Sequence, residues 1–190
     1  MKELDLALFR AINGWPDGQA GFWRFWSEAT NLHWVRIALL LLVVGMLWRG
    51  PKSRVAILLA MLAWPIANEL CDLWKDGLKD PRPFQVLPDV LMRAGRSDSF
   101  GTASAHSANM AAIAAVMIAR MGKWGWIWLA VALFTGLSRI YVGVHFPRQV
   151  LLGWATGAAA GLALVWLYGK WESRRKADAD ASLPEPEASS

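Results

Sequence analysis

Apolar residues are gathered along the chain in five long runs that are separated by shorter polar segments. The runs cover roughly residues 33–48, 55–74, 105–119, 124–138 and 150–168. A helix needs about 20 mainly apolar residues to cross a bilayer, and the longer runs approach that length. The pattern therefore predicts an all-α, polytopic transmembrane bundle of five to six membrane helices.

The first residues have a different pattern, in which apolar and charged positions are mixed. Over residues 2–13, Leu4 and Leu8 alternate with Asp5 and Arg10. Such mixing is typical of an amphipathic helix at a membrane surface, although the sequence leaves open whether this helix crosses the membrane or lies on it. No signal peptide is expected, because the apolar run starts only in the thirties.

The last apolar run carries Gly153, Gly157 and Gly161 at four-residue spacing. This stripe of small residues favours close packing of one helix against another. The tail that follows is rich in Ala, Ser, Glu and Pro, so it lacks the apolar residues needed for a core. We therefore expect one integral-membrane domain over residues 1–170 and a disordered, cytoplasmic tail over residues 171–190.

The second run contains polar residues that are costly at membrane depth, among them Asn68, Glu69 and Asp72. Asn68, Asp72 and Lys75 fall at i, i+4 and i+7, which places them on one stripe of a helix. We expect Asp72 or Glu69 to hold Lys75 in position. The alternative is that these residues are solvated polar groups at a helix contact.

The composition narrows the function classes. Hydrophobic residues make up 55% of the 190 residues and charged residues only 18%, which leaves no room for a large catalytic domain outside the membrane. The thirteen Trp, many of them near the ends of runs, indicate interfacial belts. The single Cys71 excludes an internal disulfide and a Cys-based zinc site, and His33 has no partner motif. We expect no metal and no cofactor.

The formal net charge of +5 does not indicate nucleic acid, because the basic residues adjoin apolar runs. If five spans alternate, the basic segments 49–54, 120–123 and 170–176 share one face, which should be cytoplasmic. The other face holds segments 75–103 and 139–149, which are also basic. Basic residues on the face where the rule disfavours them suggest a function there.

The residues with catalytic potential lie in those two outer segments and the adjoining helix ends: Lys75, Arg82, Ser104, His106, Ser138, Arg139 and His145. Ser104 and His106 open an Ala-rich helix, whose free N–H groups form a natural phosphate site. Fixed cations can stabilise the non-bridging oxygens of a phosphoryl group in its transition state. Two histidines can act as nucleophile and as general acid, since either protonation state is accessible near neutrality.

Three segments hold these residues in a recognisable order. They are Lys75-Asp-Gly-Leu-Lys-Asp-Pro-Arg82-Pro83, then Ala103-Ser104-Ala105-His106, then Ser138-Arg139-Ile-Tyr-Val-Gly-Val-His145-Phe-Pro-Arg-Gln149. Over about residues 55–165 the chain resembles the type 2 phosphatidic acid phosphatase family, which shares its site with vanadium haloperoxidases. Each segment alone is a weak pattern, but the three together in a polytopic chain are specific.

The resemblance implies a role for each matching residue. His145 would be the nucleophile and His106 the general acid, and the phosphate would be held by Lys75, Arg82, Ser104, Ala105 and Arg139. Three positions depart from the family pattern: Ala103 replaces Pro, Ala105 replaces Gly, and Gln149 replaces the Asp that orients the nucleophile. A Gln carbonyl still accepts a hydrogen bond from imidazole, but it supplies no negative charge. We therefore expect reduced basicity at His145 rather than inactivity.

The implied function is that of a metal-independent lipid phosphate phosphatase in a bacterial inner membrane, with its site on the extracytoplasmic face and a phosphohistidine intermediate. Small members with a short amphipathic N-terminus resemble undecaprenyl pyrophosphate phosphatases, so that lipid is the first expected substrate. Phosphatidic acid, phosphatidylglycerol phosphate and lipid A 1-phosphate are the alternatives. A non-catalytic lipid-phosphate binder or transporter subunit is the rival from another class. The sequence predicts no oligomeric state.

Overall fold

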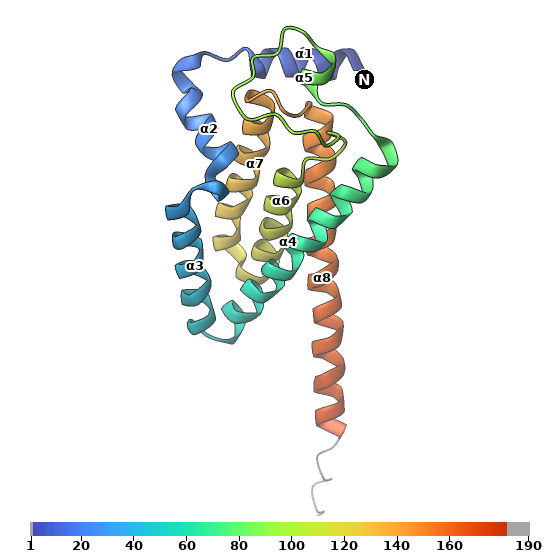
Figure 1. The fold of residues 1–190 in the computed structure, drawn as a ribbon. Helices are drawn as coiled ribbons and strands as arrows, with labels where there is room; N and C mark the ends of the chain where they lie inside the picture. Colours follow the sequence, from blue (N-terminus) through green and yellow to red (C-terminus); the bar gives the residue numbers. More distant parts are fainter. Residues whose placement is uncertain (1, 182–190) are drawn as a thin grey trace, which may run out of the picture.

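The computed structural model describes residues 2–181, and every regular element in that part of the chain is a helix (Figure 1). The elements are α1 (Lys2–Asn13), η1 (Asp17–Gln19), α2 (Ala20–Glu28), η2 (Ala29–Asn31), α3 (His33–Trp48), α4 (Pro51–Leu78), α5 (Pro83–Val86), α6 (Ala105–Met121), η3 (Gly122–Gly125), α7 (Trp126–Tyr141) and α8 (Pro147–Ala181). The prediction of an all-α chain is confirmed.

Three helical segments of the described residues are long and apolar enough to cross a membrane: Pro51–Val86, Ala105–Tyr141 and Pro147–Ala181. A fourth is added if Asp17–Asn31 and His33–Trp48, which meet at a bend of 60°, form one broken span. The prediction of five to six membrane helices is not confirmed. One reason is length, because α3, α6 and α7 have only 16, 17 and 16 residues, whereas a straight span needs about 20.

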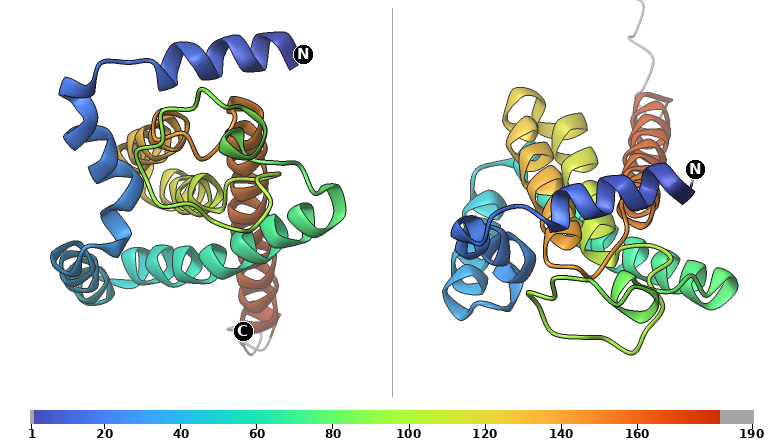
Figure 2. Two further views of the ribbon diagram at one scale, coloured as in Figure 1. Left: turned by 45° about the horizontal axis from the view of Figure 1, so that its top comes forward. Right: turned by 90° about the horizontal axis from the view of Figure 1, so that it is seen from above.

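Helix α6 occupies the centre of the bundle, with α4, α7 and α8 packed around it (Figures 1 and 2). The glycine stripe of α8 faces α6, as the sequence predicts. A methyl group on Gly157 would overlap the main chain at Ala108, and one on Gly161 would meet the carbonyl of Ala112. Because only glycine leaves this space, the stripe brings the two helix backbones into direct contact. The main core cluster lies between α4, α6 and α8.

The amphipathic helix predicted over residues 2–13 is present as α1. It lies across one end of the bundle, above the ends of α7 and α8 (Figure 2). Its apolar side buries Phe9 against Phe146, with ring centroids 5.2 Å apart. On the same helix, the Asp5 carboxylate is bound by Arg148 at the start of α8. Helix α1 is therefore fixed to the end of the bundle by both apolar and charged contacts.

The long segment between α5 and α6 folds over the same end of the bundle. Arg93 fixes it, because this nearly buried guanidinium donates to the main-chain oxygens of Asn13 and Tyr141 at 2.7 and 3.1 Å. The Asn13 side chain completes the junction by pairing with the main chain of Leu91. Buried polar groups that are fully paired in this way hold a loop in one position.

The end of the chain differs from the sequence-based prediction. A disordered tail is expected from residue 171, but α8 continues as a helix to Ala181. This stretch is rich in Ala, Lys, Arg and Glu, which have high helix propensity, and a helix that already exists needs no new nucleus to continue. Residues 182–190 of the expected tail lie outside the described residues.

Candidate active site

Arg82 lies just after α4, and its side chain is only 5% exposed. Its Nε donates to the main-chain oxygen of Ser99 at 2.7 Å, and its Nη2 donates to the Ser99 hydroxyl at 2.9 Å. Its Nη1 donates to the main-chain oxygen of Val144 at 3.2 Å and lies 3.1 Å from Nε2 of His145. The planar guanidinium is thus held rigidly beside one ring nitrogen of that histidine.

His145 follows α7 in a buried turn and is 3% exposed. Its Nδ1 lies 3.2 Å from both the main-chain oxygen of Gly101 and Oε1 of Gln149. A carbonyl only accepts, so Nδ1 carries the proton and donates it to these oxygens. Nε2 then carries the lone pair, which accepts from Arg82 Nη1 at 3.1 Å. This is the tautomer that a nucleophilic imidazole needs.

The surroundings of His145 also favour its neutral form. Burial lowers the pKa of His145 well below its ordinary value of 6.5, and the charges of Arg82 and Arg139 lower this pKa further. The hydrogen bond to Gln149 acts in the opposite direction but is outweighed. The surroundings therefore favour the unprotonated ring, whose Nε2 carries the lone pair.

His106 lies in the first turn of α6 and is partly exposed. Within the described residues its ring makes no side-chain hydrogen bond, and it lines a cavity. Arg139, Arg82 and Lys75 all lie near enough to act on it electrostatically. One histidine is thus held rigidly by hydrogen bonds, whereas the other is left available at the edge of a cavity.

Arg139 comes from the last turn of α7. Its Nη1 donates to the hydroxyl and the main-chain oxygen of Ser27, at 2.6 and 3.2 Å. Its Nε is buried and has no partner among the described residues. A buried guanidinium N–H without an acceptor is costly, and an anionic ligand would satisfy it.

Lys75 lies in the last turn of α4 and donates from Nζ to the Asp72 carboxylate at 2.6 Å. The Asn68 amide donates to the other oxygen of Asp72 at 3.2 Å. Asp72 is therefore the acidic residue that contacts Lys75, and no contact from Glu69 to this lysine is found in the described part of the chain. The Lys75 ammonium keeps two N–H groups for a further ligand.

Ser104 and Ala105 lie at the start of α6. Ser104 is the N-cap of α6, and its fully buried hydroxyl accepts from the Ser107 hydroxyl at 2.9 Å. Ala105 is the first residue of the helix and lines the cavity. The structure thus brings Lys75, Arg82, Arg139 and both histidines to one end of the bundle, while the Ser104 side chain acts as a helix cap.

Sequence reasoning misses several residues of this site. Ser27 holds Arg139, Gly101 accepts from His145, and Asp80 accepts from Gln149. Ser27 and Gly101 lie outside the three motifs and carry no local signal. Asp80 lies inside the first motif, where an acidic residue between Lys75 and Arg82 could have drawn attention.

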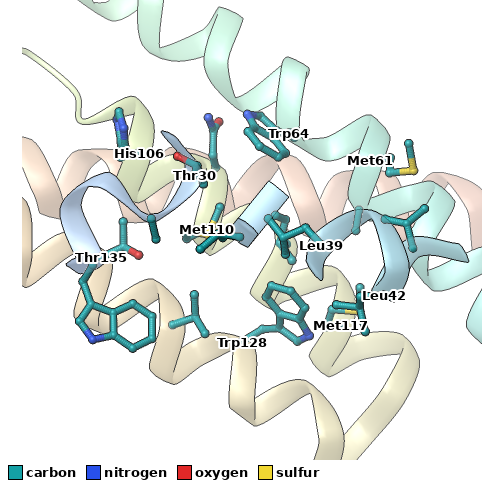
Figure 3. Close-up of a pocket in the computed structure, with 18 of the residues that line it drawn as sticks. Thr30, Leu39, Leu42, Met61, Trp64, His106, Met110, Met117, Trp128 and Thr135 are labelled. Atoms are coloured by element: carbon teal, nitrogen blue, oxygen red, sulfur yellow. The ribbon is translucent and has the colours of Figure 1, made fainter. Parts of the chain in front are cut away.

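An apolar cavity of about 540 Å³ adjoins the site. It lies between α2, α3, α4, α6 and α7, and Figure 3 shows His106 at one end of it and Leu42, Met61 and Met117 towards the other. Its wall is mostly aliphatic, aromatic or methionine side chains, and its polar residues are Thr30, Asn31, Asn68, His106, Asn109 and Thr135. No group of three or more His, Cys, Asp or Glu that could hold a metal ion is found among residues 2–181.

Comparisons with known proteins place this geometry in context. The family model described as "PAP2 superfamily" matches residues 53–173, which include both histidines. The chain is 32% identical over 127 residues to the "Bacitracin transport permease protein BcrC" of Bacillus licheniformis, an alignment that covers 66% of this chain. That alignment spans only 62% of the relative, so the chain matches less than two thirds of its length.

A second relative is covered more fully. The "Undecaprenyl-diphosphatase BcrC" of Bacillus subtilis is 30% identical over 151 residues, which are 78% of this chain and 76% of that protein. Among solved structures, that of Aquifex aeolicus LpxE superposes with a TM-score of 0.71 at 26% identity, and covers 85% of this chain and 94% of that one. The helical arrangement is therefore shared with a solved structure over nearly its whole length.

Proposed function

Since this chain belongs to the PAP2 superfamily, we propose that it is an integral-membrane lipid phosphate phosphatase whose first substrate is undecaprenyl pyrophosphate. The cationic cluster and the two histidines form its active site. Apolar segments of membrane-spanning length place the protein in a bilayer, where such a substrate is dissolved.

The observation that carries this proposal is the meeting of two environments at His106. On one side are Arg82, Arg139 and Lys75, which suit a phosphate group. On the other side is the apolar cavity, which suits a hydrocarbon chain. A molecule with a phosphate at the end of a long apolar chain satisfies both at once.

The first chemical step follows from the tautomer of His145. Its Nε2 lone pair attacks the terminal phosphorus, a P–N bond forms, and the bond from phosphorus to the bridging oxygen breaks. The bound phosphate anion offsets the positive charges near His106, which lets this histidine hold a proton. His106 gives that proton to the leaving oxygen. Arg82, Arg139 and Lys75 stabilise the charge on the non-bridging oxygens. The products of this step are undecaprenyl phosphate and a phosphorylated His145.

The second step returns the enzyme to its starting state. Neutral His106 takes a proton from a water molecule, whose oxygen attacks the phosphorus. The P–N bond breaks, inorganic phosphate leaves, and His145 recovers its Nε2 lone pair. His106 ends the cycle protonated, so protons balance over the two steps.

Two findings support a polyprenyl substrate. The relative from Bacillus subtilis is named as an undecaprenyl-diphosphatase. The cavity has a volume of about 540 Å³, within the range of roughly 300–1,000 Å³ typical of small-molecule sites. It can therefore enclose the part of a long chain nearest the phosphate, with the rest in lipid. Phosphatidic acid, phosphatidylglycerol phosphate and lipid A 1-phosphate are the competing substrates.

The basic segments support a site on the extracytoplasmic side, in a bacterial inner membrane. Arg49 lies in the α3–α4 turn, Lys52 in the first turn of α4 and Lys123 in η3. These segments lie at the end of the bundle opposite the start of α6 (Figure 1). The positive-inside rule assigns that end to the cytoplasm.

The test is phosphate release by the purified protein in detergent, in the presence of a chelator, from a panel of these four lipids. We expect release from undecaprenyl pyrophosphate, inhibition by vanadate, and loss of release in His145→Ala and His106→Ala. His33→Ala is the matched control, because His33 is exposed at the start of α3 and outside the site. A wild-type protein that releases no phosphate from any member of the panel refutes the proposal.

The rival function is lipid-phosphate binding without catalysis, and the substitution of Gln149 for Asp motivates it. It predicts saturable binding of the same lipids without phosphate release. Equilibrium binding measured beside the activity panel therefore separates the two functions.

A further inference from the structure

Gln149 occupies the position at which the family pattern has Asp, and its side chain has a fixed orientation. The residue is fully buried. Its Oε1 accepts from the Phe146 main-chain N–H at 3.1 Å and from His145 Nδ1 at 3.2 Å. Its Nε2 donates to the Asp80 carboxylate and the Pro81 main-chain oxygen, both at 2.8 Å. Because donors face the oxygen and acceptors face the nitrogen, the amide has one satisfied orientation.

Asp80 lies directly behind this amide and is itself held on several sides. Arg148 donates to its carboxylate from Nη2 at 2.8 Å and from Nε at 3.1 Å. The Asp80 main chain donates to the Thr102 hydroxyl at 2.9 Å and accepts from the Gly101 N–H at 2.8 Å. The carbonyl of Gly101 is the other acceptor for His145 Nδ1. Asp80 therefore organises both acceptors of that N–H.

The chemistry of His145 gives this arrangement a purpose. When Nε2 forms a bond to phosphorus, the ring becomes positively charged while Nδ1 still donates its proton. A neutral amide accepts that proton without offsetting the charge. Asp80 places a carboxylate one hydrogen bond further away, in a partly buried setting where charges interact more strongly than in water.

We propose that Asp80 is a positioning residue for His145 and that its carboxylate, acting through the Gln149 amide, replaces the carboxylate that the family pattern has at position 149. Gln149 relays the interaction in both directions: it accepts from the ring and donates to Asp80. The inference rests on the proposed function, because it assigns a role at the same site.

A purely structural role is the competing explanation. The Asp80 carboxylate pairs with Arg148, which also binds Asp5 of α1, so Asp80 could serve only to tie α1 to the bundle. The two explanations differ in what repairs the loss of the charge. If Asp80 only ties α1 to the bundle, its pair with Arg148 must be kept. If Asp80 acts on His145 through the amide, which we call the relay, positions 80 and 149 need one carboxylate and one amide between them, in either order.

The experiment exchanges the two groups at nearly constant shape. The variants are Asp80→Asn, Gln149→Glu and the double variant Asp80→Asn with Gln149→Glu, each made in the full chain and purified in detergent. We expect Asp80→Asn to lower kcat about tenfold, as loss of an outer partner of a functional histidine typically does, with KM little changed. Gln149→Glu alone sets two carboxylates against each other and should also lower kcat.

The double variant decides between the explanations. It restores one carboxylate and one amide, so we expect kcat to recover to near the wild-type value, although the pair with Arg148 is still missing. A double variant as slow as Asp80→Asn, or slower, overturns the relay. A raised KM with unchanged kcat in Asp80→Asn also overturns the relay. A charge that acts on the phosphorylated ring must change kcat.

Vanadate binding measures the same effect without turnover, since vanadate bonded to Nε2 imitates the transition state. We expect about tenfold weaker vanadate binding in Asp80→Asn and recovery in the double variant. If the wild type binds vanadate but releases no phosphate, the proposed function fails and the binding series alone decides the relay. If it neither binds vanadate nor releases phosphate, both fail, because there is no nucleophile to support. A wild type that is active but shows no recovery refutes only the relay.

Discussion

Ser27 offers a sharp test of the proposed phosphate site, because it contacts Arg139 from α2, far in sequence from every motif. Its hydroxyl accepts from Arg139 Nη1 at 2.6 Å, and the residue is 1% exposed. In Ser27→Ala the main-chain oxygen at 3.2 Å remains as an acceptor, but the closer one is lost. A hydrogen bond to a charged group contributes about 1.5–3 kcal/mol, and the remaining acceptor favours the lower end of that range.

This free energy translates into a rate. If Arg139 binds the transition state, the loss of about 1.5 kcal/mol of hydrogen-bond free energy between Ser27 and Arg139 lowers kcat/KM roughly tenfold. A change of ~1.36 kcal/mol in the activation free energy corresponds to a factor of ten. The assay is steady-state phosphate release from undecaprenyl pyrophosphate in detergent. Ser173→Ala is the matched control, because the Ser173 hydroxyl donates to the Gly169 main-chain oxygen on an exposed turn of α8 remote from the site. This variant should have the wild-type kcat/KM.

The reasoning is refuted if Ser27→Ala keeps the wild-type kcat/KM while Arg139→Met is inactive. That result would mean that Arg139 reaches the phosphate without support from α2. An equal loss in Ser173→Ala would instead show that the assay reports general instability.

Three further predictions concern other parts of the structure. Asp72→Asn should lower kcat about tenfold without reducing the amount of protein in the membrane fraction, as loss of an outer partner of a site residue does, and normal turnover would discard the role of this contact. The lowered pKa of His145 keeps its Nε2 unprotonated in mild acid, so the acid limb of kcat/KM should lie below pH 6.5, the ordinary value for histidine; a limb at or above that value contradicts the burial argument. Gly157→Leu should lower the thermal midpoint in detergent, because its side chain would meet the α6 main chain at Ala108 and overpacking costs about 1–3 kcal/mol. Gly169→Leu should not lower the midpoint, because no atom of another element lies within 4 Å of the added Cβ and Leu favours a helix more than Gly.

The sequence predicts this fold well where its signals are local. The amphipathic pattern of α1, the long apolar runs of α4 and α8, and the glycine stripe all depend on residues close together in the chain. The number of spans is harder to predict, because a mainly apolar helix of 16 or 17 residues is too short to decide between a crossing helix and a buried one. The helical end of α8 is missed because composition predicts the absence of a core, not the absence of a helix.

In the candidate site, too, local signals in the sequence are predictive and long-range contacts are not. Motif spacing points to Arg82, His106 and His145, and the structure brings them to one end of the bundle. The partners that orient them come from segments whose positions follow only from tertiary packing. Ser27 reaches Arg139 across 112 residues of sequence, and Gly101 reaches His145 across 44. Periodicity and motif spacing do not predict such contacts, so sequence reasoning identifies candidate reacting groups but not the residues that hold them.

The departure from the family pattern at residue 149 illustrates why a site can change one residue without losing its geometry. The main-chain oxygen of Gln149 accepts from the Ser104 N–H at 3.0 Å, which ties the start of α8 to the start of α6 and therefore to His106. Any residue type at 149 keeps this main-chain contact. Only the side chain reaches His145, so replacing Asp by Gln leaves the spacing of the two histidines intact and alters the charge beside one of them. A nearby carboxylate such as that of Asp80 can then restore the charge without rebuilding the site.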